Sequence, residues 1–181
     1  MALDVAGEAP IERTARQLAP GWLTMSLLAL AVLSVDQALK ESVRAVFEPG
    51  EGFHLFGSYS IQHVQNTGVA GGGFQGSALP LTVLALLAMV GLYDFLASRG
   101  HGRMSLVIGF GLLIGGGLGN LLDRARLGLV TDFIRNGPNA FNLADIAIFV
   151  GGLIVLVALV GSYVRTRIRR KALPQPTSSG A

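Results

Sequence analysis

Residues 104–124 read MSLVIGFGLLIGGGLGNLLDR, and this apolar, glycine-rich run decides the fold class. No charged side chain occurs over residues 104–122, and about 20 such residues suffice for a helix to cross the hydrocarbon core of a bilayer. Small residues let membrane helices approach one another closely. The stretch therefore predicts a membrane-spanning helix that packs against a neighbouring helix and ends at Asp123 and Arg124.

Three further apolar runs, over residues 22–40, 79–97 and 143–164, are also long enough to span a membrane as helices. The run over 143–164 is glycine-rich, so we expect it to pack against the run over 104–122. The composition agrees, because 51% of residues are hydrophobic, only 14% are charged and the mean hydropathy is +0.55. Soluble domains are nearer to about 25% charged. We therefore predict an all-α membrane protein with four transmembrane helices.

Basic residues in short loops indicate which side of the membrane is cytoplasmic. With four crossings, nine basic residues fall on one side, namely Arg13, Arg16, Arg99, Arg103, Arg165, Arg167, Arg169, Arg170 and Lys171. Both termini are therefore predicted to be cytoplasmic. Residues 1–20 then form an N-terminal tail, residues 21–165 the membrane domain, and residues 166–181 a basic C-terminal tail. Disorder is expected over residues 1–20 and 173–181.

The basic residues give the chain a pI near 9.8. Orientation in a membrane explains their distribution, so no nucleic-acid partner is expected. The basic C-terminal tail also predicts contact with anionic membrane lipids. The first apolar run is interpreted as an uncleaved signal anchor, because it is long and its far end carries Asp36 and Lys40.

The loop between the first two apolar runs has an alternating pattern. Phe53, Leu55, Tyr59 and Ile61 all fall at odd-numbered positions. A period of two predicts a short strand or hairpin on the extracytoplasmic side. The turn-forming run NTGVAGGG follows at residues 66–73.

Four aspartates are predicted to gather near the outer membrane boundary. Asp36, Asp123 and Asp145 lie at helix ends, and Asp132 lies in the outer loop. Ionisable residues at membrane depth are costly and usually functional. Two aspartates that share a site can hold one proton between them, so that one activates water while the other hydrogen-bonds a substrate carbonyl. The pattern is compatible with peptide hydrolysis that needs no metal and no nucleophilic side chain.

Other interpretations of these acids stay open at this point. Each aspartate could instead cap a helix or pair with Lys40, Arg124 or Arg126. Ion or proton transport also uses buried acids, although the runs over 79–97 and 143–164 carry no charge in mid-bilayer. A non-catalytic membrane scaffold is the third alternative.

Several other chemistries have no support in the sequence. The chain contains no cysteine, which excludes disulfides, thiolate metal sites and a cysteine nucleophile. His54, His63 and His101 form no HExxH pair and are expected on the surface or in loops. No GxSxG motif is present for a serine nucleophile. Neither a metal nor another cofactor is therefore expected.

Five blocks of sequence stand out in order along the chain. They are DQALK at 36–40, NTG at 66–68, GGGLGNLLDR at 115–124, VTDFI at 130–134 and FNLAD at 141–145. Together they resemble the lipoprotein signal peptidase (signal peptidase II) family, and the resemblance covers about residues 21–165. It implies an aspartic endopeptidase of the bacterial inner membrane. Its substrates would be prolipoproteins, cleaved just before a diacylglyceryl-modified cysteine.

The resemblance also implies roles for individual residues. Asp132 and Asp145 match the catalytic pair of the family. Residues that match positions for substrate binding or support of the site are Asn66, Gly68, Asn120, Asp123, Arg124, Asn142, Asp36 and Lys40. Asp36 and Lys40 are expected to pair with each other at the end of the first helix.

The sequence departs from the family pattern in two places. After NTG it continues VAGGGF, where the family usually has Ala-Ala-Phe. The stretch between Asp132 and Phe141 is also shorter than in many members. Neither departure removes a carboxylate of the proposed pair.

Overall fold

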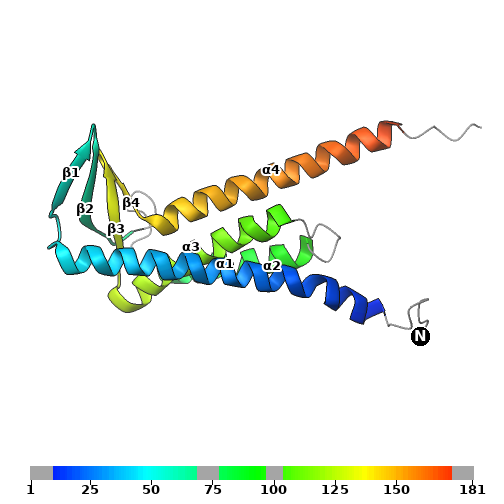
Figure 1. Ribbon diagram of the computed structural model, residues 1–181, viewed down its shortest axis with the longest axis horizontal. Helices are drawn as coiled ribbons and strands as arrows, with labels where there is room; N and C mark the ends of the chain where they lie inside the picture. Colours follow the sequence, from blue (N-terminus) through cyan, green and yellow to red (C-terminus); the bar gives the residue numbers. More distant parts are fainter. Residues whose placement is uncertain (1–9, 69–77, 97–103, 173–181) are drawn as a thin grey trace, which may run out of the picture.

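The computed structural model describes residues 10–68, 78–96 and 104–172. Four helices carry most of this chain: α1 (Pro10–Val46), α2 (Ala78–Leu96), α3 (Met104–Leu127) and α4 (Leu143–Ala172) (Figure 1). Each helix contains most or all of the apolar run that predicted it. The altered run over residues 69–74 and the residue His101 lie outside the described ranges.

The helices are longer than the apolar runs. Helix α1 already begins at Pro10, so the prediction of a disordered tail is wrong for residues 10–20. Helix α3 continues past residue 122 because the residues that follow, including Arg124, are good helix formers. It ends where Gly128 adopts a φ of 74° and donates its N–H to Arg124 O at 3.1 Å.

Within the described residues, three helices are long and apolar enough to cross a membrane: α1 over Gly21–Val46, α3 over Met104–Leu127, and α4 over Leu143–Ile168. The apolar part of α2 that the structure describes is shorter, Thr82–Leu96. The structure therefore supports a mostly helical, multi-pass membrane protein. A crossing by α2, the fourth of the sequence analysis, stays a prediction.

A four-stranded antiparallel sheet lies at one end of the helices, where α1 ends and α4 begins (Figure 1). Its strands are β1 (Gly52–Phe56), β2 (Tyr59–Asn66), β3 (Val130–Asn136) and β4 (Asn139–Phe141), in that spatial order. The first two strands confirm the predicted hairpin. The last two were not predicted, and the placement of Asp132 in a loop is wrong, because Asp132 lies on β3 and faces Val64 of β2.

Glycines let α3 pack closely against its neighbours, as predicted for α3 and α4. A side chain at Gly151 of α4 would place its Cβ 2.6 Å from Gly109 O of α3. On the α1 side, a Cβ at Gly115 would lie 2.7 Å from Ala29 O. Near the other end of the bundle, Trp22 of α1 meets Tyr93 of α2 edge to face, with ring centroids 4.8 Å apart. Helix α3 is thus the central helix, and its polar end is held next to the sheet.

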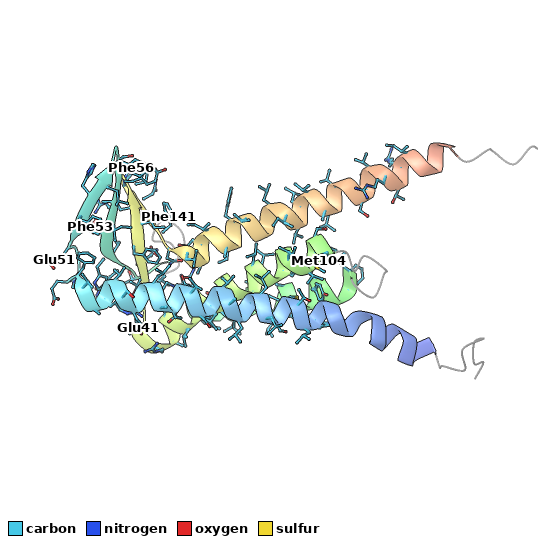
Figure 2. All side chains as sticks on the ribbon, viewed as in Figure 1. Glu41, Glu51, Phe53, Phe56, Met104 and Phe141 are labelled. Carbon is cyan, nitrogen blue, oxygen red and sulfur yellow. The ribbon has the colours of Figure 1, made fainter. Side chains whose placement is uncertain are left out.

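The two ends of the molecule differ (Figure 2). Phe53, Phe56 and Phe141 mark the sheet end, and Met104, the first residue of α3, marks the opposite end. Towards that opposite end, α4 diverges from the other helices (Figure 1). Large apolar side chains on α4 are exposed, among them Phe149, Leu156 and Val160. An exposed apolar helix face suits contact with lipid.

Candidate active site

Asp132 is one of two carboxylates that define the candidate site. It lies on β3 with only 1% of its surface exposed. Its Oδ1 accepts a hydrogen bond from Asn142 Nδ2 at 2.7 Å, and its Oδ2 accepts one from Asn66 Nδ2 at 3.0 Å. Asn66 ends the neighbouring strand β2, so strand pairing brings this amide to the carboxylate.

Asp145, in the first turn of α4, is the second carboxylate. Its Oδ2 accepts the backbone N–H of Asn142 at 3.1 Å, and Asn142 Oδ1 accepts the backbone N–H of Asp145 at 2.9 Å. This reciprocal pair is a capping box, which satisfies two free N–H groups at the start of the helix. Asn142 therefore touches both carboxylates, because its side-chain amide also bonds Asp132. One asparagine brings the two predicted acids into a single site.

Asn120 of α3 forms the floor of this site. Its Nδ2 donates to Asp145 Oδ1 at 2.8 Å. Its Oδ1 accepts from Lys40 Nζ at 3.0 Å and from Asn142 Nδ2 at 3.2 Å. With both donors pointing at the oxygen, the amide can present only its N–H₂ group to Asp145.

Behind Asn120 lies a buried ionic cluster. Lys40 and Asp36, both fully buried, pair at 2.8 Å as predicted, and Lys40 Nζ also lies 3.3 Å from Asp123 Oδ2. Asp36 Oδ1 accepts the N–H of Ala144 at 2.9 Å, at the start of α4. Burying such charges is tolerable only when each is paired and hydrogen-bonded, as these are. The cluster ties α1 to α3 and α4 beneath the candidate site.

Asp123 and Arg124 support the site from the end of α3. Asp123 Oδ2 accepts the backbone N–H of Thr131 at 2.9 Å, which fixes β3 one residue before Asp132. Arg124 donates to Asn120 O at 3.3 Å and to Gly68 O at 3.2 Å. Gly68 N in turn donates to Asn66 Oδ1 at 3.1 Å. All ten predicted site residues therefore meet in one hydrogen-bonded network.

Gly119 has a different role from the glycines that pack whole helices together. A Cβ at this position would lie 2.6 Å from Asp36 Oδ2 and 3.4 Å from Ala144 Cβ. Glycine therefore leaves the space in which the Asp36 carboxylate reaches the start of α4.

The sequence analysis did not assign a place in the site to three residues of the network, which are Gln37, Arg44 and Thr131. Gln37 Nε2 donates to Asp123 Oδ1 and to Gly119 O, each at 3.1 Å. Arg44 Nη1 donates to Thr131 Oγ1 at 2.6 Å. The spacing of Asp36, Lys40 and Arg44 places them on one helix face, and this was the signal that could have identified Arg44.

The two carboxylates sit among neutral donors. Within the described ranges, neither Asp132 nor Asp145 forms an ion pair with lysine or arginine. Burial raises the pKa of Asp132 to about 6, and the nearby charge of Asp145 adds to the rise, while hydrogen bonds from Asn66 and Asn142 oppose it. Asp132 can therefore exchange a proton near neutral pH, which suits general acid–base chemistry.

In the part of the chain that the structure describes, no three His, Asp or Glu side chains lie close enough together to hold a metal ion. The expectation of a surface position is wrong for His63, which is only 6% exposed and bonds Phe47 O through Nδ1 at 2.8 Å. His63 thus links the end of α1 to β2.

The fold and the site together define a multi-pass membrane protein with two carboxylates where its helices meet a small sheet. Residues 28–161 match the family model described as "Signal peptidase (SPase) II". The chain therefore belongs to the signal peptidase II family of proteases.

Curated relatives carry the name lipoprotein signal peptidase. The protein from Moorella thermoacetica is 38% identical over 71% of this chain and 87% of its own length. The protein from Deinococcus radiodurans is 32% identical over 92% of both chains. Among solved structures, one titled as a bacterial membrane enzyme at 2.3 Å resolution matches with a TM-score of 0.68. It shares 27% identity and covers 77% of this chain and 89% of its own.

Proposed function

We propose that this chain is an aspartic endopeptidase that removes the signal peptide from diacylglyceryl-modified prolipoproteins. Cleavage falls on the N-terminal side of the lipidated cysteine, and Asp132 and Asp145 are the catalytic pair. One observation carries the proposal: Asn142 bonds both carboxylates, so residues from β3 and α4 converge on one site. The names of the curated relatives support the substrate class.

The reaction follows from a pair that holds one proton. The ionised carboxylate takes a proton from water, whose oxygen attacks the scissile carbonyl carbon. The protonated carboxyl gives its proton to the carbonyl oxygen, so no free oxyanion forms. Collapse of the tetrahedral intermediate breaks the C–N bond, as the leaving amine takes a proton from the protonated carboxyl and a hydroxyl of the intermediate gives its proton to the other carboxylate. The pair therefore again holds one proton. No metal or covalent intermediate is needed.

Asn66, Asn120 and Asn142 position the pair by donating hydrogen bonds to carboxylate oxygens. Neutral donors orient an acid without the fixed charge that would hold it ionised at all pH values. Asp36, Lys40, Asp123 and Arg124 support this arrangement from behind. Gly68 holds the segment after Asn66 near the site through Arg124.

The membrane placement belongs to the same proposal. Four helices cross the bacterial inner membrane, both termini are cytoplasmic, and the sheet lies on the extracytoplasmic side. A diacylglyceryl group keeps its acyl chains in the bilayer, so the scissile bond lies near the interface. Carboxylates at the sheet end of the helices lie at that depth and can still reach water.

The experiment uses the purified full chain with a diacylglyceryl-modified precursor and its unmodified counterpart. Asp132→Asn and Asp145→Asn should each lower cleavage of the modified precursor by at least about 100-fold, because each removes a proton-transfer group. The matched control is Asp94→Asn, which changes an exposed carboxylate on α2 and should cleave normally. Full activity in either site variant would defeat the catalytic pair, and cleavage of both precursors would defeat the lipid requirement.

A further inference from the structure

A groove lies between α3 and α4 at the end of the bundle opposite the sheet. Its volume is about 480 Å³, within the range of roughly 300–1,000 Å³ that is usual for ligand sites. Its wall includes Ser105 of α3 and Ile154, Val157, Ala158 and Gly161 of α4, and Arg165 completes it. Ser105 follows Met104, which Figure 2 places far from the sheet. The groove is therefore separate from the candidate active site.

The groove exists because the contact between α3 and α4 opens along its length. Close backbone contact runs from Gly116 of α3 and Ala144 of α4, beside the sheet, to Gly109 of α3 and Gly151 of α4. Beyond that contact, α4 diverges from α3 (Figure 1). At Gly161 an added Cβ would find no atom within 4 Å. Because Gly161 has no side chain, the space next to this part of α4 stays open.

Charge indicates the kind of molecule that fits. Arg165 follows Gly161 by one helical turn, so its guanidinium lies at the end of the apolar wall. No carboxylate within the described ranges pairs with Arg165, and the sequence has no acid in residues 97–103 or after Asp145. Arg167 differs, because its guanidinium lies 5.4 Å from the centre of the Tyr163 ring. Arg165 is thus a cation next to an apolar groove within a membrane-spanning helix.

We propose that this groove binds one anionic phospholipid, with an acyl chain along Ile154, Ala158 and Gly161 and the phosphate on Arg165. Basic residues near a membrane surface attract anionic lipid by about 1 kcal/mol each, which corresponds to about a fivefold preference. The apolar wall supplies affinity for the acyl chain of the lipid, whichever head group the lipid carries. The proposal does not depend on the cleavage reaction, because the groove lies at the other end of the helices.

The test titrates the delipidated full chain in detergent with dioleoyl phosphatidylglycerol or dioleoyl phosphatidylcholine and measures retained lipid by native mass spectrometry. The wild-type chain should prefer phosphatidylglycerol about fivefold. Arg165→Gln should retain both lipids equally, while Gly161→Leu, which fills the groove, should lose most of the retention of both. The controls are Arg167→Gln and Gly91→Leu, since an added Cβ at Gly91 also meets no atom within 4 Å.

Each result decides the proposal. Wild-type retention in Gly161→Leu would show that the lipid binds elsewhere. Equal loss of the preference in Arg165→Gln and Arg167→Gln would show that the whole basic tail attracts anionic lipid without a defined site. Because Arg165 is exposed, Arg165→Gln is expected to fold and keeps the proposal testable even if Gly161→Leu does not.

Discussion

Lys40 shows how much a single side chain can hold together in this protein. Its ammonium group is fully buried and contacts Asp36, Asp123 and Asn120. Replacing it by methionine keeps much of the volume but leaves buried Asp36 without a cation and buried Asp123 with only Arg44, at 3.7 Å. Breaking a buried pair in this way costs about 3–5 kcal/mol.

We therefore expect Lys40→Met to lower the melting temperature in detergent strongly and to lower cleavage, since Asn120 loses the donor that fixes its amide. The matched control is Arg126→Gln, which removes an exposed ion pair with Glu41 at 3.4 Å. Exposed pairs contribute little to stability, so this control should melt like the wild type. Equal melting of the two variants would contradict the supporting role of Lys40.

The raised pKa of Asp132 predicts a pH dependence of stability. Between its ordinary pKa of 3.8 and its folded value of about 6, the folded protein holds a proton that the unfolded chain has released. The free energy of unfolding should therefore fall as the pH rises from about 4 to about 6, by up to about 3 kcal/mol. Below that window both states hold the proton, and above it both have released it, so Asp132 adds no further pH dependence outside the window.

Melting temperatures of wild type and Asp132→Asn, measured across this pH range, check the prediction. The variant cannot titrate at this position and should lack the fall. Asp94→Asn, with its exposed carboxylate on α2, should keep it. A wild-type slope in Asp132→Asn would assign the titration to another group.

Residues of the candidate site could be predicted only where a sequence motif contained them. Asp132 and Asp145 stand in recognisable blocks, and the structure brings them together on Asn142. Thr131 could not be predicted, because its backbone N–H and its hydroxyl reach Asp123 and Arg44 only through the position of β3. Gln37 gave no signal either, since a single amide beside Asp36 is compatible with an ordinary helix surface.

At the scale of elements, the contact between α3 and α4 gives a prediction from two adjacent glycines. A Cβ at Gly151 would lie 2.6 Å from Gly109 O, whereas one at Gly152 would meet only Leu113 Cδ2, at 4.0 Å. We expect Gly151→Ala to destabilise the fold by about 1–3 kcal/mol, because two backbones must separate. Gly152→Ala should keep or slightly raise stability, because alanine favours the helix.

Thermal unfolding in detergent separates these two variants, which share their helix, their chemistry and their size. If both melted like the wild type, helix α4 would not depend on close backbone contact with α3.

The helices and the first hairpin could be predicted from hydrophobic pattern alone, but β3 and β4 could not be recognised from the runs we used. Strand β3 is largely buried on both faces, so it lacks the alternation that revealed the first hairpin. The turn Asn136-Gly137, with a φ of 58° at the glycine, was the available signal. Recognising it would have placed Asp132 on a strand.

At the scale of the whole molecule, the predicted orientation can be tested because the chain contains no cysteine. Single cysteines at Ser58, in the turn after β1, and at Thr166, near the end of α4, give unique labels on exposed positions. With both termini cytoplasmic, a membrane-impermeant maleimide should label Ser58→Cys in intact spheroplasts and Thr166→Cys only after lysis. The reverse pattern would place the candidate site on the cytoplasmic side.

The buried contact between Asp36 and Ala144 joins residues 108 positions apart. A ribosome needs roughly 5–20 s to make that length of chain, so α1 enters the bilayer long before its partner is synthesised. During this interval Asp36 and Lys40, one helical turn apart, neutralise each other. The charges of Asp36 and Lys40 are thus already paired while α1 is in the bilayer without α4. The contact between Asp36 and Ala144 forms only after α4 has been synthesised and inserted.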